Sequence, residues 1–97
     1  MSYIWNRHAR LEYYEAIEYY ARIDGKLGER FVAGVEEAIE KMSRTPERFR
    51  RFESDMRKVR VDGFPYGVIY RIEGRELHII AVMHLHRRPG YWRDRLN

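Results

Sequence analysis

Two histidines, two arginines and two aromatic residues follow the most apolar segment of the chain. The apolar segment, Leu77–Met83, contains almost no polar residue. The residues behind it that could do chemistry are His84, His86, Arg87, Arg88, Tyr91 and Trp92. Side chains that emerge at the end of a rigid strand are well placed for function. Four more cations, Arg57, Lys58, Arg60 and Arg71, lie on the neighbouring predicted strands.

A cationic and aromatic group of this kind suits two uses. One is phosphate neutralisation with base stacking on Tyr91 or Trp92, joined by general acid/base cleavage of RNA by a histidine. The other is docking onto an enzyme that handles DNA. A structural interpretation stands beside both: Arg60 and Arg71 form surface ion pairs, and Trp92 packs on the sheet. The residues alone leave the three interpretations open.

Other chemistries lack the residues that they need. His84 and His86 alternate onto one face of a strand, but no third metal ligand is evident nearby. The serines have no triad pattern around them, the glycines form no phosphate loop, and paired carboxylates are missing from the strand ends. We therefore expect neither a metal nor a cofactor.

A β-hairpin positions the cationic group. Tyr66–Ile72 and Leu77–Met83 are rich in β-branched and aromatic residues, and the polar stretch 73–76 between them has a glycine for a tight turn. The second of these strands should lie centrally in a sheet, because both of its faces are apolar. Alternation over Met56–Val61 predicts a further strand, which a turn at Asp62-Gly63 connects to the hairpin.

Two amphipathic helices precede the strands. Asn6 is a good N-cap for a helix from Arg7 to about Asp24, and Gly25 is expected to end it in a left-handed conformation. The spacing places Tyr13 and Tyr20 in the core and leaves Tyr14 and Tyr19 partly exposed. A second helix runs to about Ser43 and ends before Pro46.

The order β-α-α-β-β-β predicts an α+β fold, in which a helical hairpin packs on a small antiparallel sheet with a candidate N-terminal strand at Tyr3–Trp5. Residues 1–97 suffice for a single domain. The chain has no cysteine, no signal peptide pattern and no apolar run of membrane-spanning length, so we expect a cytoplasmic protein. Its charge is uneven: residues 1–43 carry a net −2 and residues 44–97 a net +6, which suggests an acidic partner for the second half.

The chain resembles the RelE/ParE superfamily of toxins from bacterial type II toxin–antitoxin systems over nearly its whole length. The similar stretches are EAIEYY (15–20), LGERFVAGVEEAIEKM (27–42) with Pro46, the strands from Arg57 to His84, and HRRPGYWRDRL (86–96). The FPY turn at Phe64–Tyr66 and the RPGYW ending at Arg88–Trp92 are more similar to the ParE branch. The resemblance implies a toxin of a plasmid-stabilisation type that a cognate antitoxin neutralises.

The target is open between two branches of the superfamily. A ParE-type member would inhibit DNA gyrase by direct binding and would not be an enzyme, with Arg87, Arg88, Tyr91 and Trp92 as exposed determinants. A RelE-type member would be a ribosome-dependent mRNA endonuclease, and the residues that could fill its catalytic positions are Arg57, Lys58, Arg71, His84, Arg87 and Tyr91. An inactive member that retains only antitoxin binding is the third alternative.

The resemblance also implies where the antitoxin binds. A ParD-like antitoxin segment would fold onto a groove beside the sheet and form a hetero-oligomer with the toxin. The residues expected to contact it are Ile4, Val59, Arg60, Arg71 and Leu85. Contact with DNA would be indirect, through the antitoxin, and no membrane is involved.

Overall fold

The helical hairpin reverses direction at a single residue. The computed structural model describes residues 1–88 and 90–96, and its helices are α1 (Arg7–Ile23) and α2 (Gly25–Arg44). Asn6 caps α1 as predicted, because its side-chain oxygen accepts from the backbone N–H groups of His8 and Ala9 at 2.8 and 3.3 Å. Asp24, extended at φ −163°, ends α1, and its carboxylate accepts from the N–H of Lys26 to cap α2.

This double role of Asp24 corrects one prediction. Gly25 was expected to adopt a left-handed conformation, but it is the first residue of α2 and its φ is not positive. No left-handed residue is needed there, since the extended Asp24 already breaks the helix. The glycines of the two predicted turns do need their freedom: Gly63 and Gly74 have φ of 81° and 63°.

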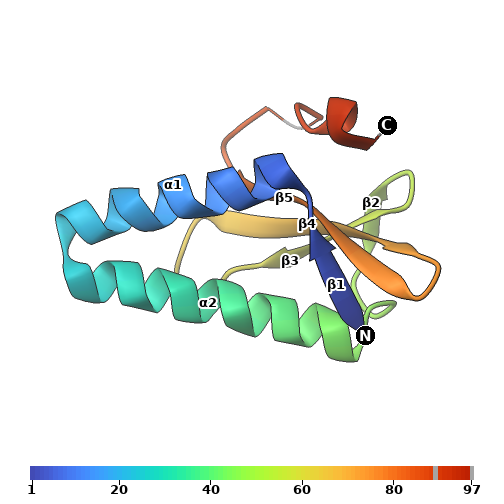
Figure 1. Ribbon diagram of the computed structural model, residues 1–97, viewed down its shortest axis with the longest axis horizontal. Coiled ribbons are helices and arrows are strands. Elements are labelled where there is room, and N and C mark those ends of the chain that lie inside the picture. Colours follow the sequence, from blue (N-terminus) through green and yellow to red (C-terminus); the bar gives the residue numbers. More distant parts are fainter. Residues whose placement is uncertain (89, 97) are drawn as a thin grey trace.

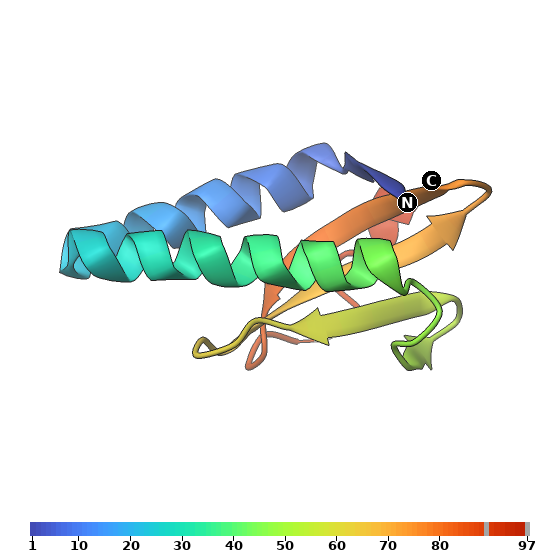
Figure 2. The same ribbon diagram turned by 90° about the horizontal axis from the view of Figure 1, so that it is seen from below.

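The sheet has five strands: β1 (Ser2–Trp5), β2 (Arg51–Glu53), β3 (Met56–Arg60), β4 (Tyr66–Glu73) and β5 (Glu76–His84). Their spatial order is β1-β5-β4-β3-β2, so the apolar β5 is internal, as predicted. The strands from β2 to β5 are antiparallel, but β1 runs parallel to β5 and makes the sheet mixed. Both helices cover one face of this sheet (Figures 1 and 2). No helix of the described ranges is long and apolar enough to cross a membrane.

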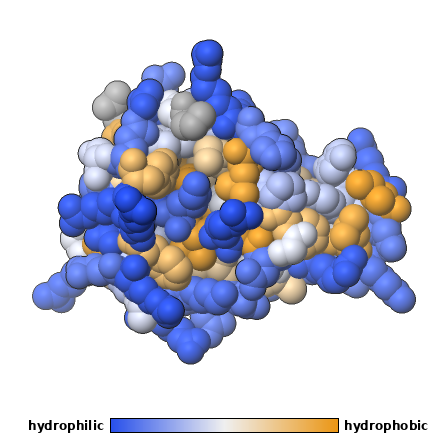
Figure 3. Space-filling model, turned by 180° about the vertical axis from the view of Figure 1, so that it is seen from behind, coloured by the Kyte–Doolittle hydropathy of each residue, from blue (hydrophilic) through white to orange (hydrophobic). Residues whose placement is uncertain are grey.

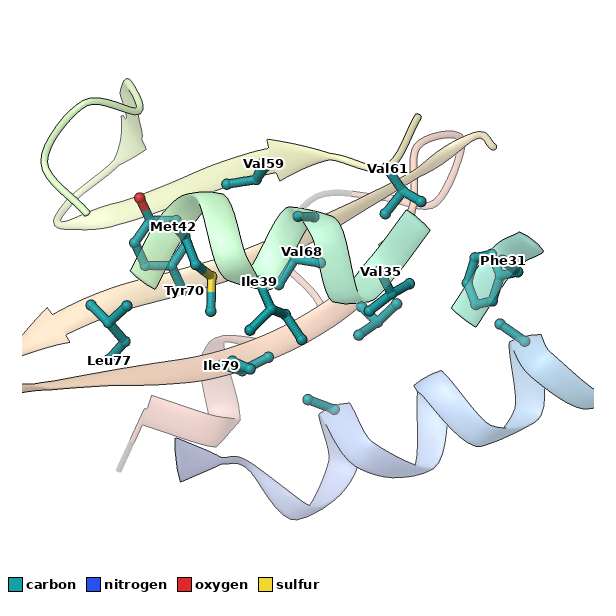
Figure 4. Packing of buried hydrophobic residues seen from close by; sticks show 14 residues of the cluster. Phe31, Val35, Ile39, Met42, Val59, Val61, Val68, Tyr70, Leu77 and Ile79 are labelled. Atoms are coloured by element: carbon teal, nitrogen blue, oxygen red, sulfur yellow. The ribbon is translucent and has the colours of Figure 1, made fainter. Parts of the chain in front are cut away.

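The main core lies between this face and the helices (Figure 4). The apolar stripe of α2 meets side chains from three strands; the buried residues include Phe31, Val35, Ile39, Met42, Val59, Val61, Val68, Tyr70, Leu77 and Ile79. Tyr13 and Tyr20 border the core while Tyr14 and Tyr19 are exposed, which confirms the predicted orientation of α1. Val59 is 3% exposed, so the prediction that it lines an open groove is wrong: the helix-facing side of β3 is covered by α2.

The opposite face carries a smaller apolar cluster that the C-terminal segment covers. Its strand residues are Met56, Ile69, Ile80, Ala81 and Met83, and Trp92 completes it. Figure 3 shows the side of the molecule away from the helices, where apolar surface in the middle is bordered by hydrophilic side chains. Trp92 is 1% exposed and packs edge-on against Phe52 with ring centroids 5.8 Å apart. The prediction of an exposed Trp92 is therefore wrong, because the apolar strand residues on this face need a cover.

A β-bulge interrupts the ladder between β4 and β5. Ile69 pairs with Ala81 and Tyr70 with Ile79, so Ile80 is an extra residue without a partner on β4. Ile80 and Ala81 both belong to the cluster on the far face, whereas Ile79 and Val82 belong to the core beneath the helices. Beyond the bulge the alternation is shifted by one residue, and His84 consequently lies on the same face as Tyr66 and α1.

Candidate target-binding site

The shifted end of β5 borders a hollow of about 330 Å³ beside α1, called the α1–β5 hollow below. Its walls come from α1, the start of β4, the end of β5 and the C-terminal segment that follows β5. The described residues of this segment, 85–88 and 90–96, are called the tail below. The lining residues are Glu12, Glu15, Ala16, Tyr19, Tyr66, Val82, His84, Arg87 and Tyr91. Three predicted site residues, His84, Arg87 and Tyr91, therefore meet here, and the bulge is the reason that His84 can join the other two.

Glu12 is the most densely bonded polar side chain of this region. One carboxylate oxygen accepts from the N–H of Val82 at 3.1 Å, and the two oxygens together accept from both terminal nitrogens of Arg95 at 2.8 and 3.1 Å. Arg95 also donates to the carbonyl of Ile80 at 3.1 Å. The side chains of Glu12 and Arg95 are only 15% and 13% exposed, so this pair is shielded from water.

Two guanidinium groups lie near the ring of Tyr91. Its ring is 3.8 Å from the guanidinium carbon of Arg87 and 5.1 Å from that of Arg95, which are cation–π distances. Its hydroxyl is buried without a well-formed hydrogen bond. Burial and, next, the neighbouring Glu12 carboxylate raise the pKa of Tyr91 above its ordinary value, while Arg95 and Arg87 oppose the rise. The phenol of Tyr91 therefore stays protonated at neutral pH.

The two histidines contact each other. The ring centroids of His84 and His86 are 5.1 Å apart, and Nδ1 of His84 accepts from the backbone N–H of His86 at 3.1 Å. In the neutral ring this bond places the proton on Nε2. Residues 1–88 and 90–96 contain no group of three metal-ligating side chains.

The remaining predicted cations are dispersed. Arg57 is 9% exposed and donates to the carbonyls of Glu47 and Phe49 at 2.8 and 2.7 Å, so it holds the connection after α2 in place. This correction removes Arg57 from the phosphate-binding candidates. Lys58 lies 5.5 Å from the ring centre of Phe52. Arg71 donates to Glu73 at 3.0 Å and pairs across the sheet with His78.

The residues expected to contact an antitoxin fall into two groups. Ile4 is 44% exposed, Arg60 is exposed, and Leu85 and Arg71 are half-buried, so all four remain accessible to some degree. Val59 is not accessible, as described above. Arg88 is exposed in the tail, and Arg87 has 55% of its side chain exposed.

Sequence reasoning missed Glu12, Arg93 and Arg95. Arg95 binds Glu12, and Arg93 donates from Nε to Glu53 on β2 at 2.8 Å, so the tail is tied to the body at two carboxylates. A signal for Glu12 was present: it lies three residues after Ala9 and four before Ala16, on the buried side of α1. A carboxylate on the apolar side of a helix requires a partner.

Comparisons with known proteins identify the family. A family model described as the ParE toxin of the type II toxin–antitoxin system parDE matches residues 3–89. A chain from the "Chromosomal ParDE TA system from P. aeruginosa" superimposes with a TM-score of 0.77 at 19% identity, covering 89% of this chain and 97% of that one. A "YoeB/ParE toxin from Agrobacterium tumefaciens" does so with a TM-score of 0.58 at 19% identity, covering 87% and 98%.

At such identity these two likenesses concern the fold, which they share with this chain over nearly its full length. The comparison with curated proteins found no significant match. The family model, in contrast, matches the sequence itself, from β1 through the hairpin and into the tail. The chain therefore belongs to the ParE toxin family of type II toxin–antitoxin systems.

Proposed function

We propose that this toxin inhibits DNA gyrase by direct binding, without chemistry of its own, and that a cognate ParD-like antitoxin neutralises it in the cytoplasm. The observation that carries the proposal is that some residues of the tail attach it to the body while others face solvent. Arg93, Arg95 and Trp92 hold the tail to the body, whereas Arg87 and Arg88 present their charge to solvent. Exposed cations beside an aromatic ring are suited to a protein surface of opposite charge.

The dispersal of the other cations supports binding over RNA cleavage. Arg71 pairs with His78, while His84 pairs with Tyr66 five residues back along β4, a separation of roughly 16 Å along the strand. The two residues also lie on opposite faces of the sheet. Of the six candidate catalytic residues, only His84, Arg87 and Tyr91 line one hollow, whereas Arg57 is buried and Lys58 and Arg71 do not line that hollow.

A supercoiling assay tests the target. Purified toxin, gyrase and relaxed plasmid are incubated with ATP, and loss of supercoiling is expected as toxin is added. The Arg87→Ala/Arg88→Ala variant should inhibit only at higher concentration, because it removes the two outward cations. Arg48→Ala/Arg50→Ala is the matched control, since it removes two exposed arginines from the connection after α2.

Three results would redirect the proposal. Equal inhibition by both variants would refute the assignment of Arg87 and Arg88. Undisturbed supercoiling, with mRNA cut on translating ribosomes, would make the protein an endonuclease of the RelE type. Undisturbed supercoiling and intact mRNA, with antitoxin binding retained, would make it an inactive member.

A toxin–antitoxin family implies an antitoxin partner, and charge supports the surface that it uses. Strands β2 to β5 and the tail lie in the half of net charge +6, where Arg60 and Arg88 are exposed and Leu85 is half-buried. An acidic antitoxin segment would be steered to this half, so its association rate should fall as salt rises. Stopped-flow mixing at low and high ionic strength measures this, and a constant rate would exclude steering.

A further inference from the structure

We infer that Glu12 is a positioning residue that sets the orientation of Arg87 through the C-terminal tail, without touching the target itself. The contacts between Glu12, Arg95 and the bulged backbone of β5 are called the Glu12 clasp below. The contacts of the clasp are seen in the structure, whereas its effect on gyrase inhibition rests on the proposed function.

The bulge creates the backbone groups that the clasp uses. Since Ile80 has no partner on β4, the ladder is interrupted beside the carbonyl of Ile80 and the N–H of Val82. Arg95 donates to that carbonyl, and Glu12 accepts from that N–H. The same two side chains then bind each other through two hydrogen bonds. Helix α1, strand β5 and the tail are thereby joined at one shielded point.

Contacts with the Tyr91 ring link the orientation of Arg87 to that of Arg95. Arg95 is fixed by the clasp, and its guanidinium carbon is 5.1 Å from the centre of the Tyr91 ring; that of Arg87 is 3.8 Å from the same ring. Tyr91 cannot turn easily, because it packs against the cluster that Trp92 completes. Arg87 is thus held against a ring whose own place depends on Arg95 and Glu12.

The charge of Glu12 is matched mainly by Arg95, and that of Arg87 remains available to a partner. Glu12 contacts Arg95 at 2.8 Å but is 3.9 Å from Arg87, so its charge is mainly matched by Arg95. Arg87 keeps 55% of its side chain in solvent. A guanidinium that is fixed on one side and free on the other can bind a partner carboxylate with little further ordering.

Glu12→Gln tests the inference. Glutamine has the same shape and can still accept from Val82, so the fold should persist, but Arg95 loses its counter-charge. Trypsin cleavage after Arg87 is expected to become about tenfold faster, because a charge-assisted contact that holds the tail is weakened. Glu18→Gln is the matched control, since Glu18 lies on the same helix in an exposed pair with Arg22. Arg95→Gln removes the clasp from the tail side and should reproduce the effect if Glu12→Gln does not fold.

A double-mutant cycle separates positioning from general support. Glu12→Gln should raise the toxin concentration needed for half-inhibition of gyrase about tenfold, but should add little when Arg87 is already alanine. Equal effects in both backgrounds, or unchanged cleavage after Arg87 in both clasp variants, would overturn the inference. A wild-type toxin that leaves gyrase unaffected would refute the proposed function alone, and the cleavage rates would then decide whether the clasp holds the tail.

Discussion

Arg57 offers the sharpest test of the division between supporting and functional cations. Its guanidinium donates to the carbonyls of Glu47 and Phe49, and only 9% of the residue is exposed. We predict that Arg57→Met, which keeps the apolar stem, lowers the free energy of unfolding by about 3 kcal/mol. Each hydrogen bond from a charged donor contributes about 1.5–3 kcal/mol, so losing two could cost more than this. The predicted loss is at the lower end because water can reach part of the exposed connection after α2 once the donor is gone.

Urea unfolding followed by circular dichroism measures this loss. The matched control is Arg60→Met on the same strand, because Arg60 is exposed and should change stability by no more than about 0.5 kcal/mol. Arg57→Lys should fall between the two, since one ammonium cannot reproduce the fork of a guanidinium. An Arg57→Met protein as stable as the wild type but without toxicity would refute the reasoning and return Arg57 to the functional residues.

Three further predictions concern a buried phenol, the helical hairpin and the tail. Burial raises the pKa of Tyr70 to about 12, against the lowering effect of Arg57. An unfolded tyrosine has its ordinary pKa of 10.0, so it loses its proton at a lower pH than the folded Tyr70. The free energy of unfolding should therefore decrease as the pH rises from 10.0 to about 12. Tyr70→Phe should make the urea midpoint less dependent on alkaline pH, and an unchanged slope would exclude Tyr70 as its source. Gly28→Ala should destabilise the protein by about 1–2 kcal/mol, because the new methyl carbon would lie 3.0 Å from Cβ and 3.1 Å from Cα of Ala21. Gly25→Ala has open space and should stabilise by about 0.5 kcal/mol; thermal melts of the pair would contradict the packing if both shifts had the same sign. Trp92→Ala should cost about 3 kcal/mol by uncovering the second cluster, and a urea midpoint like that of the wild type would show that the tail does not cover it.

Local patterns were sufficient for both helices and for strands β1, β3, β4 and β5, but they did not predict the short strand β2. The cap at Asn6, the turns at Gly63 and Gly74, and the apolar stripes of both helices depend on residues close in sequence, and each formed where predicted. The central place of β5 also followed from its two apolar faces. The exception among local features was Gly25, where the competing cap at Asp24 decided the geometry.

The site was predictable in composition but not in arrangement. The sequence named His84, Arg87 and Tyr91, and these three do line one hollow. The sequence could not distinguish these three from Arg57 and Trp92, a cation and an aromatic residue that are buried. Whether a cation supports the fold or faces a partner depends on contacts with distant residues, such as the 83-residue separation between Glu12 and Arg95.

The amino-acid sequence by itself determined the helical hairpin, four of the five strands and the family, because periodicity, caps and turns are encoded within a few residues of one another. Tertiary structure alone decided the bulge at Ile80, the parallel pairing of β1 and the path of the tail across the sheet. The physical reason is that a strand's register is chosen by the surfaces on both sides of it. In β5, that choice turned His84 toward α1 and left the two backbone groups that Glu12 and Arg95 now bind.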